Sequence, residues 1–265
     1  MLRLSIFAAA LLAASGHAQK LALDLLPEPL LIKRLSEGQV KQGLRQEEIH
    51  RVFEEAGCKP VDQPIDHSSG NVVCTLPGET GSEIVVGGHF DFAGQGYGIV
   101  DDWSGAALLP SLYQTLKSQP RHHTFVLVSF GEEERGLFGS RWFVKHLSPG
   151  ERADILAFMN LECLGLGHVN VWTTRSTKSL VLSLNQVAHA LSIPLFTVNV
   201  DRVGDDDTHP FLGAKIPVLS IHSITEATLP VLHSPADRLS AVKPGSYYES
   251  YRLVAFYLAW LDAVD

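Results

Sequence analysis

The segment "HTFVLVSFGEEERGLFGS", from His123 to Ser140, places a buried-strand pattern directly beside a concentration of negative charge. Its first eight residues are mostly apolar and do not alternate, which predicts a strand covered on both faces, as inside a parallel or mixed sheet. Three glutamates follow at once, and residues 136–147 then have the pattern of a helix. Carboxylates packed together at the end of a buried strand either point to water or surround a positive charge.

The alternation of strand and helix patterns continues in both directions along the chain. Further strands are predicted at 71–76, 83–91, 155–165, 168–172, 195–200 and 216–223. Further helices are predicted at 37–57, 104–118, 177–191 and 245–262. We expect Gly57 to stop the first of these helices and Ser104 to cap the second. This order predicts a three-layer α/β/α sandwich with a mixed, mostly parallel central sheet.

The length and composition suit one globular domain. The chain has 265 residues, of which 45% are hydrophobic, and this is sufficient for one sizeable core. The formal net charge is -8, and the acidic residues are scattered along the chain. Binding to nucleic acid by electrostatic attraction is therefore not expected.

The first 18 residues, "MLRLSIFAAALLAASGHA", have the features of a secretory signal. Arg3 precedes an apolar run, and the small residues Gly16 and Ala18 follow at the spacing that a signal peptidase prefers. The alternatives are a membrane anchor or the first helix of the domain, but a bilayer span needs roughly 20 apolar residues. We therefore expect residues 1–18 to be a cleaved signal peptide and 19–265 to be one domain, exported to the periplasm or the medium without a membrane anchor.

The chain has three cysteines, and export permits a disulfide. Cys58 and Cys74 flank the turn-rich segment "KPVDQPIDHSSGNVV", which a bridge between them would close. The alternative is two buried thiols. We expect the bridge, and we expect Cys163 to be reduced.

Carboxylates and imidazoles follow the ends of several predicted strands, where functional groups gather in α/β sheets. The residues that follow strands are His89, Asp91, Glu132, Glu133, Glu134, Glu162, His222 and His233. Two aspartates, Asp101 and Asp102, directly precede a predicted helix. Taken singly, each has an ordinary explanation, such as a hydrogen-bonded histidine, a helix N-cap or a solvated acidic loop. Glu162, however, stands in an apolar stretch where an unpaired carboxylate would be costly to bury.

Taken together, these side chains predict a zinc centre. Histidine nitrogens and carboxylate oxygens are donors that zinc accepts. Two zinc ions with a bridging carboxylate and a bridging water would supply the positive charge that the glutamates need, although one ion is the alternative. Zinc lowers the pKa of a bound water towards about 7, and an adjacent glutamate would take its proton.

The order of the motifs "GGHFD", "DDWSG", "EERGLFGS", "NLE" and "LHSPAD" resembles the zinc exopeptidase family of bacterial leucyl aminopeptidases, glutamate carboxypeptidases and glutaminyl cyclases. The motifs run from His89 to Asp237, most of the chain after the predicted signal. The resemblance implies the α/β sandwich already predicted. It implies a zinc ligand set of His89, Asp101, Glu134, Glu162 and His233. It also implies that Asp101 bridges, that Glu133 is the general base and that Asp91 orients His89.

The family pattern also assigns the three consecutive glutamates. One residue separates the ligand glutamate from "GLxGS" in the family, and Arg135 holds that place here. The resemblance thus implies Glu134 as the ligand, Glu133 as the base and Glu132 as a rim or solvated residue.

Two departures from the family pattern concern the metal and the substrate. The family usually has aspartate where this chain has Glu162, whose longer side chain is still expected to reach a metal. In "VGDDDTHPF", Thr208 separates Asp207 from His209, and this loop is expected to line the substrate pocket. His222 is a candidate donor to the substrate, or alternatively a hydrogen-bonded residue at a strand end.

Three functions are weighed on this basis. The expected one is an aminopeptidase that hydrolyses peptides with a free N-terminus, since no second domain or substrate-carboxylate site is visible. The alternative is a glutaminyl cyclase, a transferase with one zinc ion that converts an N-terminal glutamine into pyroglutamate. A catalytically silent relative that only binds a partner is the remote alternative, because such relatives typically lose ligands or the base.

Overall fold

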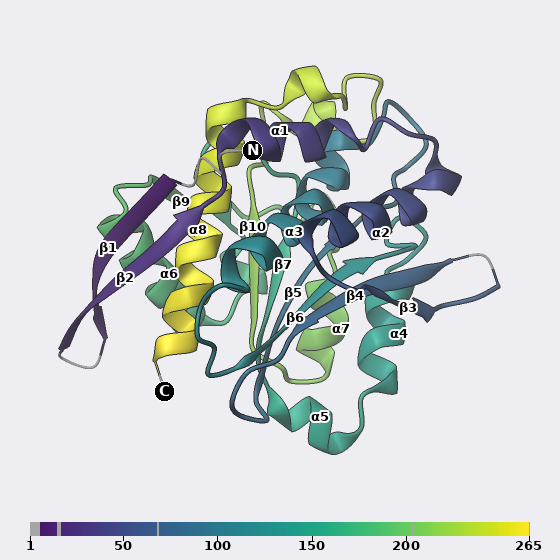
Figure 1. Cartoon of the computed structure of the whole chain (residues 1–265). Helices are drawn as coiled ribbons and strands as arrows, with labels where there is room; N and C mark the ends of the chain where they lie inside the picture. Colours follow the sequence, from purple (N-terminus) through teal and green to yellow (C-terminus); the bar gives the residue numbers. More distant parts are fainter. Residues whose placement is uncertain (1–5, 15–16, 68, 203, 265) are drawn as a thin grey trace.

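The computed structural model describes residues 6–14, 17–67, 69–202 and 204–264. An eight-stranded sheet forms its middle layer, in the order β3-β4-β6-β5-β7-β10-β8-β9 (Figure 1). The strands are β3 (Val61–Pro64), β4 (Gly70–Leu76), β5 (Glu83–His89), β6 (Thr124–Phe130), β7 (Ile155–Leu161), β8 (Val169–Val171), β9 (Leu195–Thr197) and β10 (Val218–His222). The pairs β5–β6, β5–β7, β7–β10 and β8–β9 are parallel, and β3–β4, β4–β6 and β8–β10 are antiparallel. The predicted mixed, mostly parallel sheet is confirmed.

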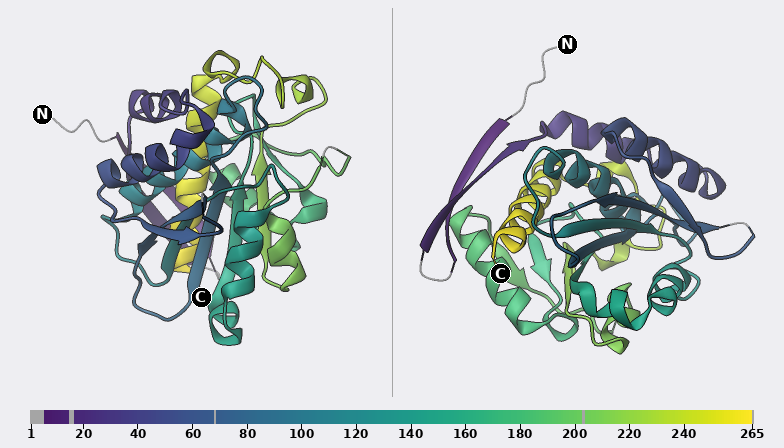
Figure 2. Two further views of the ribbon diagram at one scale, coloured as in Figure 1. Left: turned by 90° about the vertical axis from the view of Figure 1, so that its right-hand side faces the viewer. Right: turned by 60° about the horizontal axis from the view of Figure 1, so that its bottom comes forward.

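Helices cover both faces of this sheet (Figure 2). One layer holds α1 (Glu28–Ser36), α2 (Arg45–Ala56), α3 (Ser104–Leu116), α6 (Lys178–Ala190) and α8 (Pro244–Ala263). The other holds α4 (Phe138–His146), α5 (Pro149–Asp154) and α7 (Thr208–Gly213). Short helical turns complete the connections: η1 (Gln42–Leu44), η2 (Ile99–Trp103), η3 (Thr173–Arg175), η4 (Leu229–Val231) and η5 (Leu239–Ala241). The three-layer α/β/α sandwich is therefore confirmed.

Strand β6 shows why its sequence does not alternate. Phe125 and Leu127 belong to the core under α3 and α8, whereas Val126, Val128 and Phe130 belong to the core under α4 and α7. Successive side chains of a strand point to opposite faces, so a strand covered on both faces is mostly apolar without alternation. Its parallel neighbour β5, and β7 beside β5, then end at the same edge of the sheet as β6.

Two local predictions about helices are wrong. The helix predicted from residue 37 begins only at Arg45, because Gly38 packs so closely on Trp103 that a Cβ at this glycine would lie 2.2 Å from the indole. Its end is as predicted, since Gly57 has the left-handed φ of 89° that stops a helix. Ser104 is not an N-cap, because it lies inside α3 and its hydroxyl donates to the carbonyl of Val100 at 2.8 Å.

The N-terminal part contains a hairpin of β1 (Ile6–Ala14) and β2 (His17–Leu25), which pair antiparallel. The predicted signal peptide, residues 1–18, lies partly outside the described residues and stays a prediction. Within the described ranges, no helix has the length and apolar character needed to cross a bilayer.

The cysteines are arranged as predicted. Cys58 and Cys74 form a disulfide, with their Cα atoms 6.2 Å apart. It ties the end of α2 to β4. Cys163 is free and buried beyond the end of β7.

Candidate metal centre

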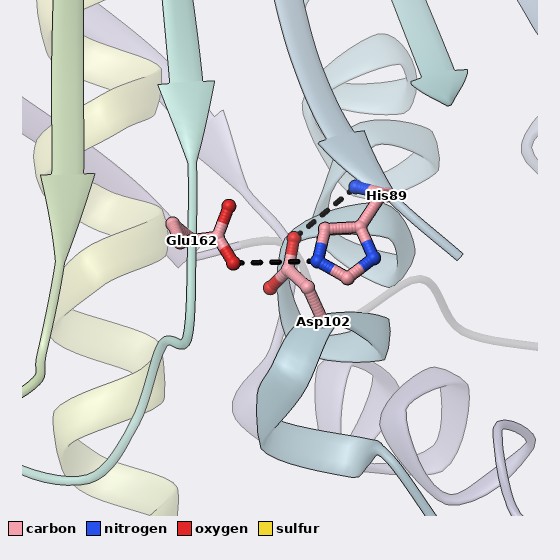
Figure 3. A group of neighbouring side chains, drawn as sticks. All are labelled: His89, Asp102 and Glu162. Atoms are coloured by element: carbon pink, nitrogen blue, oxygen red, sulfur yellow. Dashed lines mark hydrogen bonds and ion pairs between the residues drawn. The ribbon is translucent and has the colours of Figure 1, made fainter. Parts of the chain in front are cut away.

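The site forms where three parallel strands end at the same edge of the sheet. His89 is the last residue of β5, Glu133 and Glu134 follow β6, and Glu162 follows β7. Asp101 lies in the turn η2 between β5 and α3. In Figure 3 the carboxylate of Glu162 points from its strand end towards the imidazole of His89. The sheet topology thus brings residues that are far apart in the sequence together in one cluster.

One set of donors surrounds the imidazole of His89. Its Nε2 lies 3.3 Å from Oδ1 of Asp101 and 3.4 Å from Oε1 of Glu162. Donors bound to a tetrahedral zinc ion at about 2.0–2.1 Å lie about 3.3 Å from one another. These separations therefore match two edges of a zinc coordination shell, and the longer side chain of Glu162 reaches the imidazole of His89; its role as a ligand stays a prediction.

A second set of donors surrounds the imidazole of His233. Its Nε2 lies 3.0 Å from Oδ2 of Asp101 and 3.1 Å from Oε2 of Glu134. One donor atom from each of these three residues lies within 4.8 Å of the other two. Asp101 thus offers one carboxylate oxygen to each set, which is the arrangement of a bridging ligand.

Asp91 holds both His89 and the two glutamates in place. The Nδ1–H of His89 donates to the backbone carbonyl of Asp91 at 3.1 Å, which leaves Nε2 as the ligand atom. The carboxylate of Asp91 accepts the backbone N–H groups of Glu133 at 3.0 Å and of Glu134 at 3.1 Å. The contacts of Asp91 thus reach both the imidazole of His89 and the turn that carries the two glutamates; its orienting role stays a prediction.

Two further aspartates, whose roles the sequence did not reveal, fix the turn that carries Asp101. Asp102 accepts the backbone N–H of His89 at 3.2 Å and that of Cys163 at 2.9 Å, which ties two strand ends together (Figure 3). Asp237 accepts the N–H groups of Val100 at 2.7 Å and of Asp101 at 3.2 Å. With its oxygens committed to backbone donors, Asp102 is a positioning residue.

The positive charge on the histidines of the cluster is too small to balance the negative charge of its carboxylates. Burial, and then the nearby Asp101, raises the pKa of Glu134 to about 7. Burial raises the pKa of Glu133 to about 10. Burial alone would lower the pKa of His89, but Glu133 and Glu162 raise it well above its usual value. This pattern is expected of carboxylates assembled to hold a cation.

The donor set fits zinc. Oε1 of Glu134 is buried and has no hydrogen-bond partner among the described residues. A buried carboxylate oxygen without a partner is costly, and a metal ion would satisfy it. Two imidazole nitrogens with carboxylate oxygens suit zinc better than calcium or magnesium, which prefer oxygen ligands alone.

A cavity of about 410 Å³ adjoins the cluster. Its lining includes the acidic cluster residues Asp101, Glu133 and Glu134. It also includes the apolar side chains of Trp172, Val200, Ile224, Leu229 and Leu232. The cavity therefore combines acidic and apolar side chains in its wall.

The predicted substrate residues fall in different places. His222 lines the cavity, but its Nε2–H donates to the carbonyl of Val198 at 2.9 Å and its Nδ1 accepts from the N–H of Ile224 at 3.0 Å. Burial lowers the pKa of His222 to about 4. Its ring is therefore neutral and fully bonded to backbone, which favours the structural alternative.

The loop before α7 contributes different residues from those expected. Asp207 is buried at the start of α7, and His209 lies half-exposed with its Nδ1 2.5 Å from Oδ2 of Asp205. Neither of the two predicted residues lines the cavity, whereas Asp205 and Asp206 do. Three consecutive aspartates look alike in sequence, and only the start of α7 decides which of them face the cavity.

Glu132 makes a different contact from its two neighbours. Its carboxylate pairs with Arg135 at 2.7 Å; the Glu132 side chain is 15% exposed and that of Arg135 64% exposed. The triplet thus divides into a ligand candidate, a base candidate and a residue paired with Arg135, and the rim or solvated position that the resemblance implies for Glu132 stays a prediction.

Comparisons with known proteins give a family match and similar folds. The profile described as peptidase family M28 matches residues 71–258. The chain is 28% identical over 162 residues to leupeptin-inactivating enzyme 1 of Streptomyces exfoliatus, and the match covers 60% of this chain and 36% of that enzyme. The chain thus spans about a third of that relative.

Two solved structures share the fold. A zinc aminopeptidase from Bacillus subtilis superposes with a TM-score of 0.66 at 23% identity, covering 72% of this chain and 49% of that chain. A glutaminyl cyclase from an Acidobacteriales bacterium superposes with a TM-score of 0.72 at 18% identity, covering 89% of this chain and 94% of that chain.

Proposed function

The chain belongs to peptidase family M28, as its motif order predicted, and from that premise we propose that it is a zinc aminopeptidase with two metal positions. The observation that carries the proposal is the carboxylate of Asp101, whose two oxygens face separate donor sets. His89 and Glu162 belong to one set, and Glu134 and His233 to the other. A carboxylate shared between two sets is what a pair of co-catalytic zinc ions requires.

We propose Glu133 as the general base. Its Oε2 lies 3.8 Å from Nε2 of His89, and its backbone N–H is held by Asp91. Zinc bound here would polarise the scissile carbonyl and lower the pKa of a water towards about 7. Glu133 would take a proton from that water and pass it to the leaving amine. Burial raises its pKa to about 10, and a bound cation would lower this towards the working range.

The cavity supports a substrate with a free amine and a large apolar first side chain. The side chains of Trp172, Ile224 and Leu232 line its wall and would contact that side chain. The acidic side chains in the cavity lining would attract the positively charged amine. We therefore propose leucine-like or aromatic N-terminal residues as the preferred substrates.

A glutaminyl cyclase remains the second candidate, because the chain spans 94% of the cyclase structure and 49% of the aminopeptidase structure. A cyclase would close an N-terminal glutamine using one zinc ion and would release ammonia without cleaving the peptide bond. Export of either enzyme rests on the basic residue and apolar run within residues 1–18.

The proposal is tested with the purified chain, zinc and matched peptides whose N-termini are free or acetylated. The set begins with leucine, phenylalanine, lysine or glutamine, and the products are identified by mass. Release of the first residue from the free peptides alone supports the aminopeptidase, with leucine and phenylalanine fastest. Loss of ammonia from the glutamine peptide, without cleavage of any peptide, would reject it in favour of the cyclase.

A further inference from the structure

The free thiol of the chain lies within the metal centre. Cys163 is 2% exposed and lines the same cavity as Asp101 and Glu162. Its Sγ lies 3.5 Å from Oε1 of Glu162, and the same oxygen lies 3.4 Å from Nε2 of His89. One carboxylate oxygen is therefore flanked by a sulfur atom and an imidazole nitrogen.

The backbone around Cys163 is fixed, so this placement of the sulfur is built into the fold. Its φ of 49° is left-handed, which is uncommon outside glycine. Its N–H donates to Asp102 at 2.9 Å, and its carbonyl accepts the hydroxyl of Ser223 at 2.5 Å. Asp102 in turn accepts the N–H of His89, so the same carboxylate positions the imidazole and the thiol.

The distances match those of a mixed coordination shell. Around a tetrahedral zinc ion, a sulfur at about 2.3 Å and an oxygen at about 2.0–2.1 Å lie about 3.5 Å apart. The separation between the sulfur and Glu162 has this value. One donor atom each from Asp101, Glu162 and Cys163 lies within 4.8 Å of the other two. The thiol therefore belongs to a cluster of donors that also contains two carboxylates.

We propose that Cys163 is a ligand of the metal position that His89, Asp101 and Glu162 share. The inference rests on the proposed zinc centre and adds a sulfur donor to it. As the metal–sulfur bond forms, the thiol proton is released to solvent. A thiolate favours softer ions, so this position would select zinc, cobalt or cadmium over manganese or magnesium.

Cobalt(II) in place of zinc provides the test, with its absorption spectrum as the readout. Visible ligand-field bands report cobalt bound at the centre, and a near-ultraviolet charge-transfer band reports a bond between cobalt and thiolate. Cys58 and Cys74 are bonded to each other, so Cys163 is the only thiol that this band can come from. The variant Cys163→Ser is the matched control, and a competing chelator measures the zinc affinity of both proteins.

The expected result is both kinds of band in the natural protein. Cys163→Ser should lose the charge-transfer band alone and bind zinc at least about tenfold more weakly. Visible bands without a charge-transfer band in the natural protein would overturn the inference and leave the proposed zinc centre standing. No cobalt or zinc binding at all would overturn both. Because the decisive spectrum is that of the natural protein, the result does not depend on the folding of a variant.

Discussion

Removing the buried guanidinium of Arg45 should damage both the stability and the metal centre. Arg45 is 0% exposed and donates to the carbonyl of Phe90 at 2.7 Å, of Gly98 at 2.9 Å and of Gly38 at 3.0 Å, and also to that of Tyr97. Phe90 follows His89 directly, and Gly98 lies shortly before Asp101. The side chain thus clamps both ends of the loop that joins two proposed ligands.

The size of the effect follows from these four hydrogen bonds. The substitution Arg45→Met removes every donor of the guanidinium and leaves the four backbone carbonyls without this hydrogen-bond partner. Each carbonyl that stays buried without a partner lowers the free energy of unfolding by about 1–3 kcal/mol. Taking the lower limit, the free energy of unfolding should fall by about 4 kcal/mol, a large part of the usual 5–15 kcal/mol. Looser positions of His89 and Asp101 should weaken zinc binding about 10–100-fold.

Urea denaturation and chelator competition measure the two effects separately. Arg34→Met is the matched control. Arg34 is also buried, but within the described part of the chain it donates to the side chains of Ser111 and Gln114 in α3 and not to the loop between His89 and Asp101. The control should lose stability while keeping its zinc affinity once folded. If Arg45→Met loses less than about 1 kcal/mol and binds zinc like the natural protein, the clamp described here is wrong.

Three further outcomes are expected. Glu133→Gln should keep its zinc content by elemental analysis while its turnover falls roughly 10²–10⁴-fold, and near-normal turnover would remove Glu133 from its role. Burial lowers the pKa of His222 from 6.5 to about 4, so the unfolded chain binds this proton first as the pH falls. The contribution of His222 to the stability should therefore fall by about 3 kcal/mol between pH 6.5 and 4, so the stability of His222→Gln should decrease less, or increase more, than that of the natural protein as the pH falls; the same pH dependence in both proteins would contradict this. Replacing Cys58 and Cys74 by serine opens a loop of sequence separation 16 and should cost about 3 kcal/mol, so an unchanged melting temperature would contradict a stabilising role.

The sheet and the ligand candidates were predictable because each rests on a local signal. The mostly apolar, non-alternating sequence of β6 indicates burial on both faces, and this placed β6 inside a mostly parallel sheet. Parallel strands bring their carboxyl ends to one edge, so His89, Glu134 and Glu162 could be expected together. The resemblance to the family pattern before "GLFGS" then implied different roles for Glu133 and its neighbours.

The supporting residues were not predictable, because their partners are backbone atoms that only the fold brings near. Nothing in the sequence indicates that Arg45 would bond four carbonyls or that Asp237 would hold the turn before Asp101. The same limit explains the helix expected from residue 37. There the close approach of Gly38 to Trp103 and its bond to Arg45 override the helical spacing.

The most direct test of the proposed zinc centre is an anomalous-difference map, measured at the zinc absorption edge, of crystals grown with zinc. We expect two peaks that share Asp101, one beside His89 and Glu162 and the other beside Glu134 and His233. Such a map would establish both donor sets and the bridging carboxylate together. A map without peaks at this edge of the sheet would contradict the account, and a single peak beside Glu134 and His233 would contradict the paired centre and favour the cyclase.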